Sequence, residues 1–408
     1  IMSIKCDSKL LVKPLLFLVI VDTINGFFLN KGMESSIGII FKAFVLLIAF
    51  KILCSLPKFK WLLFFTIIYL PAFLILVILN TDSQIGPTIN HLLKFVNVVF
   101  IYYAAVVVFK SERIKERGIE LIFYINSIVL LLNIYSGLLG IGYYAYGEGV
   151  GCKGFIYAHN EMSGMQAVLY GVSYYFIYNR YTSKKITIFV VNVFFLIAAL
   201  LVTTKAGIFL VLISLILVPF VHMRYGIFHS FLKMSKIKFL VLLSVICLVF
   251  YYGYLLLDYS GAIERWIYFF EKDGVNALYS SRDIFWEEEK LEWEGGNIGI
   301  KLFGMGGART VEMDHADTLL NYGIVGVIIV YSFYLSLAVK AFRYRKKSQY
   351  AKFVFGMDVF ILVASCFAGH LLFSGLMGIP FALMNALVFS PRMRVVNGAE
   401  NRLCNYVI

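Results

Sequence analysis

Apolar residues occur along this chain in runs of about 20, separated by short polar connections. An α-helix needs a run of this length to cross the hydrocarbon core of a bilayer. Strands of a membrane barrel would alternate apolar and polar residues over about ten positions, and no segment here does so. The pattern therefore predicts an all-α polytopic membrane protein of about twelve transmembrane helices. The predicted spans are 10–29, 37–55, 61–80, 89–109, 118–140, 161–179, 186–203, 206–223, 237–257, 317–341, 352–370 and 372–390.

One connection is much longer than the others. It covers residues 258–317 and divides the chain into a part with nine spans (1–257), the loop, and a part with three spans and a tail (318–408). Within it, "IERWIYFFEKD" and "RDIFWEEEKLEW" space aromatic residues at three and four, which predicts amphipathic helices. Loops of this length are usually functional or disordered, so we expect the chemistry here. The alternative is a packed cap without chemistry.

Composition and charge agree with a membrane protein and orient it. Hydrophobic residues make up 61% of the chain and charged residues 15%, far from the proportions of a soluble domain. The net charge of +13 is concentrated in the two tails and in alternate short connections, which the positive-inside rule places in the cytoplasm. Both termini are therefore expected inside and loop 258–317 outside. This distribution argues against nucleic-acid binding. The six widely spaced cysteines predict neither a disulfide framework nor a zinc site.

Two candidate cations lie near predicted outer ends of helices. Lys205 follows Thr203 and Thr204 in the turn between the seventh and eighth spans, where a helix N-terminus favours an anion. Arg282 lies in the long loop and offers a planar fork that suits phosphate oxygens. The alternatives are a lysine that snorkels to the headgroups and an arginine in a loop salt bridge. Asn160 lies in a glycine-rich outer loop, just before the sixth span.

The densest polar segment is "GMGGARTVEMDHADTLLNYGIVG", where the long loop enters the tenth span. Arg309 adds a cation, and Asp314, His315 and Asp317 follow at the start of the helix. A histidine among carboxylates is a reasonable general base, because a carboxylate orients the ring and raises its basicity. Alternatively, the two aspartates only favour the helix N-terminus electrostatically. Lys94 lies inside the fourth span, where a charge is costly and points to function.

Four short elements resemble the bacterial O-antigen polymerase and ligase superfamily. "GFIYAHN" resembles its G-x-[FI]-x-x-x-N element, and "TTKAGI" resembles its T-x-[SK]-[RK] helix start. "SSRDIFW" resembles the S-G-R-x-x-[IL]-W element of the long loop, and "EMDHADTLLNYGIVG" resembles the entry into the following span. Ligases often have Arg in place of Lys205 and Asn in place of Ala316. These departures favour a Wzy-type polysaccharide polymerase over a ligase.

The resemblance implies a GT-C-like, inverting glycosyltransferase in the bacterial cytoplasmic membrane. Its donor would be a glycan on undecaprenyl diphosphate, which the enzyme moves onto a new lipid-linked repeat unit, without metal or other cofactor. Lys205 and Arg282 would stabilise the leaving diphosphate, and His315 would activate the acceptor hydroxyl. The implied partners are this glycan and membrane lipid, with a chain-length regulator as a candidate protein partner.

Five further residues are expected to help bind substrate in this scheme: Arg309, Lys94, Asn160, Asp314 and Asp317. Two other functions remain open. One is an O-antigen ligase, which moves finished polymer to the lipid A core. The other is a lipid-linked oligosaccharide flippase or other transporter, which would need its cations in a central cavity.

Overall fold

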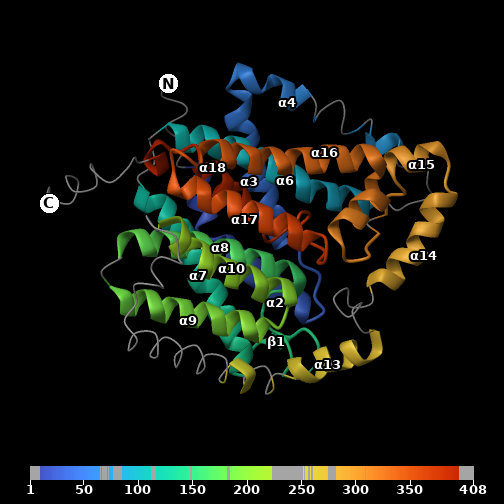
Figure 1. Cartoon of the computed structure of the whole chain (residues 1–408). Coiled ribbons are helices and arrows are strands. Elements are labelled where there is room, and N and C mark those ends of the chain that lie inside the picture. The colour runs from blue at the N-terminus through green and yellow to red at the C-terminus, as the bar shows by residue number, and fades with distance from the viewer. Residues whose placement is uncertain are drawn as a thin grey trace.

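The computed structural model describes residues 10–64, 66, 71, 73–76, 85–111, 116–147, 149–181, 184–222, 251, 253–255, 258, 261–273, 282–307 and 309–394. These residues are mostly helical and form a bundle of long apolar helices (Figure 1). The long helices are α2 (Leu18–Asn30), α3 (Ile37–Cys54), α6 (Ile85–Lys110), α7 (Glu116–Leu138), α8 (His159–Arg180), α9 (Lys185–Val202), α10 (Lys205–His222), α16 (Asp314–Tyr344), α17 (Gln349–Ser365) and α18 (Gly378–Leu387). The smaller elements are α4 (Lys60–Phe64), α13 (Ala262–Asp273), α14 (Arg282–Gly295), α15 (Ile298–Phe303), strands β1 (Tyr143–Tyr144) and β2 (Cys152–Gly154), and 3-10 helices at Pro57–Phe59 and Pro391–Arg394.

Within the part of the chain that the structure describes, six helices are long and apolar enough to cross a membrane: α3, α6, α7, α9, α10 and α16. The expectation of an all-α membrane protein is therefore confirmed. Ten of the twelve predicted spans fall on described helices, although α2 and α18 are short for a full crossing. Most of span 61–80 and of span 237–257 lies outside the described residues. The count of twelve stays a prediction.

Helix α8 lies at the centre of the bundle, in contact with α7, α9, α10, α17 and α18. Its residues from Glu161 to Phe176 are all buried, so this helix is shielded from lipid and tolerates polar side chains. Several of them hydrogen-bond to neighbouring helices, as Ser173 does with Ser127 and Gln166 with the carbonyl of Phe195. Such bonds and small residues hold helices together where the hydrophobic effect between them is weak.

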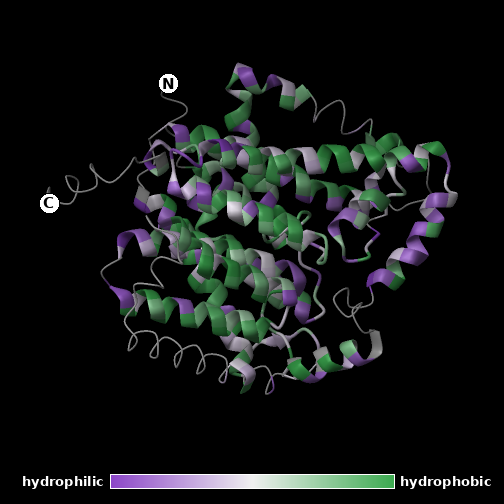
Figure 2. Cartoon of the chain, in the orientation of Figure 1, coloured by the Kyte–Doolittle hydropathy of each residue, from purple (hydrophilic) through white to green (hydrophobic). Residues whose placement is uncertain are grey.

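The two ends of the bundle differ in character. At one end, Arg180 pairs with Glu120, Lys110 lies over Phe389, and Ser348 at the start of α17 bonds to Met393. The described basic connections therefore gather there, as the charge pattern predicts. The opposite end carries β1, α13, α14 and α15 (Figure 1). Figure 2 shows hydrophobic residues along the middle of the long helices and hydrophilic residues at their ends and over α14.

The last predicted hairpin differs from expectation. We expected spans 352–370 and 372–390 with a tight turn, but α17 ends at Ser365 and α18 begins only at Gly378. The ten residues of α18 rise about 15 Å, half of a hydrocarbon core. The twelve residues between the two helices, 366–377, therefore cover the remaining depth without a regular helix. We call this segment the broken span.

The long loop contains the two expected helices, α13 and α14, and a third, α15, which aromatic spacing did not reveal. Helix α16 begins at Asp314, three residues before the predicted start, and is broken at Gly323, whose φ is 61°. The break frees the carbonyls of Leu320 and Asn321, which accept the backbone N–H groups of Met305 and Gly306. The loop after α15 is thereby fixed to the first turns of α16.

Candidate functional site

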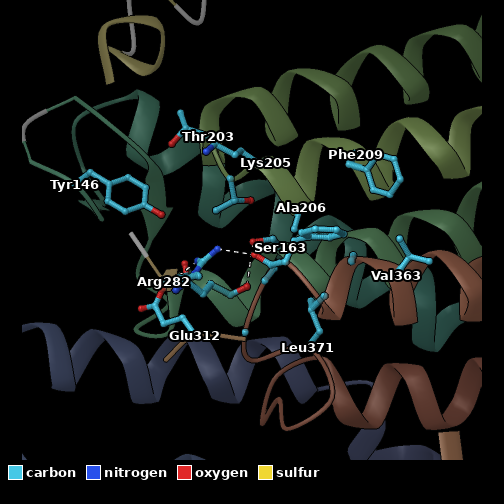
Figure 3. A pocket seen from close by; sticks show the side chains of 16 residues that line it. Tyr146, Ser163, Thr203, Lys205, Ala206, Phe209, Arg282, Glu312, Val363 and Leu371 are labelled. Atoms are coloured by element: carbon cyan, nitrogen blue, oxygen red, sulfur yellow. Dashed lines mark hydrogen bonds and ion pairs between the residues drawn. The ribbon is translucent and has the colours of Figure 1, made fainter. Parts of the chain in front are cut away.

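A cavity of about 510 Å³ opens at the end of the bundle opposite the basic connections. It is formed by the start of α8, the turn between α9 and α10, the start of α14, Glu312 and the last part of α17 with the broken span. Asn160, Lys205 and Arg282 all line it, although they lie on three different helices. Three of the eight candidate residues from the sequence thus meet in one place. Figure 3 labels two of them, Lys205 and Arg282.

Lys205 is the first residue of α10. The turn before it is tight because Thr203 has a left-handed backbone, with φ of 59°. The hydroxyl oxygens of Thr203 and Thr204 are buried and have no hydrogen-bond partner among the described residues. An unpaired buried hydroxyl costs about 1–3 kcal/mol, which a polar ligand in the cavity would recover. The N-terminus of α10 therefore presents a cation and two unpaired hydroxyls to the cavity.

Arg282 is the first residue of α14, and its side chain is 18% exposed. Its Nε and Nη2 donate to Glu312 Oε2 at 3.3 and 3.0 Å, and its Nη1 donates to the carbonyl of Phe367 at 2.7 Å. A guanidinium has five N–H groups, so two remain for a ligand. Arg282 therefore connects α14 to the broken span and keeps donors for an anion. Figure 3 shows it beside Glu312.

Three helix N-termini meet at the cavity, those of α8, α10 and α14. Each carries about half a positive charge from the helix dipole. Lys205 and Arg282 add two full charges, and among the described residues that line the cavity Glu312 is the only carboxylate. The local field is therefore positive and suits an anion such as a diphosphate.

Backbone strain is concentrated at this cavity. Among the described residues, three non-glycine residues have positive φ: Thr203, Glu312 and His370. The first two line the cavity, and His370 lies between Gly369 and Leu371, which also line it. A left-handed conformation costs a non-glycine residue about 1–2 kcal/mol, and such residues cluster at functional sites.

Asp314 and Asp317 do not line the cavity. Their carboxylates accept hydrogen bonds from backbone N–H groups. The carboxylate of Asp314 accepts the N–H groups of His370, Leu371 and Leu372 at 2.8–3.0 Å, and so fixes the broken span. Asp317 accepts the N–H of Val311 at 2.6 Å, which fixes the segment before α16. Both aspartates are buried. They shape the cavity wall and leave little capacity for a substrate.

His315 and Arg309 do not line the cavity. The side chain of His315 is exposed at the start of α16. Arg309 donates to Glu292 and Glu289 on α14 at 2.6–2.7 Å, and these hydrogen bonds raise the pKa of its guanidinium above the usual value. Arg309 therefore attaches α14 to the segment before α16.

Lys94 does not line the cavity and is paired at 2.7 Å with Glu161. Glu161 also accepts the hydroxyl of Ser374 and the N–H of Leu376 in the broken span. A second part-buried pair, Lys42 with Asp22 at 2.7 Å, lies close by, since a side chain at Gly375 would approach both Lys42 and Glu161. These charges are neutralised within the protein and hold the broken span in place.

Sequence reasoning missed two carboxylates, Glu161 and Glu312. Both were visible, in "HNEMSG" and in "VEMDHAD", but Glu161 follows the more prominent Asn160 and Glu312 precedes the more prominent His315. Among the described residues, no group of three or more His, Cys, Asp and Glu side chains could hold a metal ion.

A scan against protein-family models and a search of curated proteins find no match to this chain. The resemblance to the O-antigen polymerase and ligase superfamily therefore depends on the four short sequence elements alone, and it stays a prediction.

Proposed function

We propose that this chain is a membrane glycosyltransferase that polymerises undecaprenyl-diphosphate-linked repeat units at the outer face of the bacterial cytoplasmic membrane. One observation carries the proposal: Lys205 and Arg282 meet at a cavity where three helix N-termini begin, away from the basic end of the bundle. A diphosphate leaving group needs such positive charge as its bond to the sugar breaks.

The other wall of the cavity supports a lipid-linked substrate. It is formed by apolar residues of α10, α17 and the broken span, among them Phe209, Val363 and Phe367. These three side chains are also exposed on the flank of the bundle. A substrate with a charged head and an isoprenoid tail can therefore contact cations and apolar side chains at the same time.

In the proposed reaction, Lys205 and the two remaining N–H groups of Arg282 contact the diphosphate. Asn160, with both a donor and an acceptor on its amide, contacts sugar or phosphate oxygens. The acceptor hydroxyl of a second lipid-linked unit attacks the anomeric carbon, and undecaprenyl diphosphate leaves with inversion. Asp314 and Asp317 act indirectly, by fixing the wall against which these groups lie.

The experiment uses purified protein in lipid discs with lipid-linked repeat units isolated from cells that lack this chain. We expect Lys205→Ala and Arg282→Ala each to lower the rate about a hundred- to thousandfold, as the loss of one stabilising donor does. Lys185→Ala, an exposed change at the opposite end of the bundle, is the matched control. Normal polymer from both cavity variants would refute the proposal.

A transporter is the second candidate, because transporter sites are often formed by discontinuous helices and charged groups inside the membrane often mark a transport path. Here, however, Lys42 and Lys94 each contact a carboxylate, and neither lines the cavity. A ligase remains the other alternative. Cells that lack the chain distinguish all three: single repeat units accumulate outside for a polymerase, full-length polymer for a ligase, and units trapped inside for a flippase.

A further inference from the structure

Glu312 is held rigidly at the edge of the cavity. Its backbone is left-handed, with φ of 58°, and Gly369 packs directly against it. A Cβ atom on Gly369 would lie 2.5–2.8 Å from backbone atoms of Glu312, so only glycine fits there. On one side of Glu312, Val311 is fixed by Asp317, and on the other side α16 begins two residues later. This support fixes the direction in which the Glu312 side chain leaves the backbone.

The two carboxylate oxygens of Glu312 differ in their surroundings. Oε2 accepts both hydrogen bonds from Arg282, whereas Oε1 has no hydrogen-bond partner among the described residues. The side chain is 45% exposed and lines the cavity. One oxygen is therefore anchored, and the other is open to a ligand.

We propose that Glu312 is the general base of the transfer, a role that rests on the glycosyltransferase function proposed above. The proton of the acceptor hydroxyl moves to Glu312 Oε1 as the hydroxyl oxygen forms its bond to the anomeric carbon. The bond from that carbon to the diphosphate oxygen breaks, and its electron pair leaves with undecaprenyl diphosphate. Glu312 then releases the proton to water.

The neighbouring ionisable groups are less suited to this role. The carboxylates of Asp314 and Asp317 already accept backbone N–H groups, and Glu161 is bonded to Lys94 and the broken span. His315, one turn further along, does not line the cavity. Arg282 would act on both the base and the leaving group. Its guanidinium donates to Glu312 and also lines the cavity in which the diphosphate would lie.

The first test is Glu312→Gln, which keeps the shape of the side chain and an oxygen for Arg282 but cannot take up a proton. We expect kcat to fall about 10²–10⁴-fold, while the dissociation constant for the lipid-linked donor changes by less than about threefold. Glu287→Gln, on an α14 side chain that is 68% exposed, is the control and should leave both values unchanged.

The second test is Glu312→Gly, which suits the left-handed backbone at this position. Sodium azide is then added, because azide is a nucleophile that needs no base. We expect it to attack the anomeric carbon, giving a glycosyl azide of inverted configuration and free undecaprenyl diphosphate. A residue that only positions Arg282 would not allow this rescue.

The outcomes separate the two proposals. If the unaltered protein makes no polymer from lipid-linked units, the proposed function fails. If it does, three results would each overturn the role of Glu312: full activity of Glu312→Gln, loss of donor binding in that variant, or no azide product from Glu312→Gly. Loss of kcat with retained donor binding, together with azide rescue, supports it.

Discussion

Replacing Asp314 tests the physical account of the broken span. Its carboxylate accepts three backbone N–H groups, through Oδ1 from His370 and through Oδ2 from Leu371 and Leu372. Asparagine has a single acceptor oxygen. In its better orientation it keeps the bonds to Leu371 and Leu372 and turns its NH₂ group against the N–H of His370. Alanine leaves all three N–H groups without a partner.

The expected cost follows from these bonds. A buried N–H group left without a partner costs about 1–3 kcal/mol. Asp314→Asn should therefore destabilise the broken span by about 1–3 kcal/mol, and Asp314→Ala by up to about 9 kcal/mol if no water enters. Each 1.4 kcal/mol is a factor of about ten in the population of an opened segment, so opening should increase by about 5–150-fold for asparagine and by more for alanine.

Limited proteolysis measures this opening. Phe367 lies in the broken span with an exposed side chain, and chymotrypsin cleaves after phenylalanine. With protein in lipid discs, we expect cleavage after Phe367 to be fastest in Asp314→Ala, slower in Asp314→Asn and slowest in the unaltered protein. Glu288→Gln, an exposed charge change on α14, is the control. Equal cleavage rates for Asp314→Ala and the unaltered protein would refute the view that this carboxylate holds the segment.

Three further predictions concern orientation and the site. A cysteine replaces Gly295, where a side chain meets no atom within 4 Å, in a variant whose native cysteines are serine. It should react with an impermeant thiol reagent on intact cells or spheroplasts. Reaction only after lysis would show that the predicted orientation is wrong. Arg282→Lys should remain at least tenfold slow in polymerisation, because a compact ammonium does not replace the planar fork that bonds Glu312 and Phe367 and still has two N–H groups for a ligand. The polymerisation rate of His315→Gln should stay within about threefold of that of the unaltered protein. A large loss of rate would instead indicate that His315 is the general base.

The sequence was sufficient for the features that depend on hydropathy and charge. Long apolar runs predicted the long helices, and the distribution of Lys and Arg predicted that the basic connections share one end. Lys205 stood out as a cation at a predicted helix start, and Arg282 as a lone arginine beside a short aromatic run in the long loop. Their position on one cavity agrees with the expectation that both contact the same ligand.

The broken span could not be predicted in the same way. Segment 366–377 is almost as apolar as a helix, and its interruption depends on partners far away in sequence, Asp314 and Glu161. A carboxylate that binds backbone amides looks the same in a sequence as one that binds substrate. The choice between Glu312 and His315 likewise depends on where α16 begins and on the backbone conformation of Glu312, and neither is encoded by a local pattern.

The two part-buried ion pairs differ in how far apart in synthesis their partners are made. Asp22 and Lys42 are 20 residues apart on consecutive helices, so α2 and α3 can enter the bilayer together as a neutral hairpin. Lys94, in contrast, is made 67 residues before Glu161. A ribosome that adds about 5–20 residues per second leaves this lysine without its partner for about 3–13 s. A lone lysine at the centre of a helix costs about 2.5–3.5 kcal/mol to insert, so α6 carries an insertion cost of up to this size until α8 supplies Glu161.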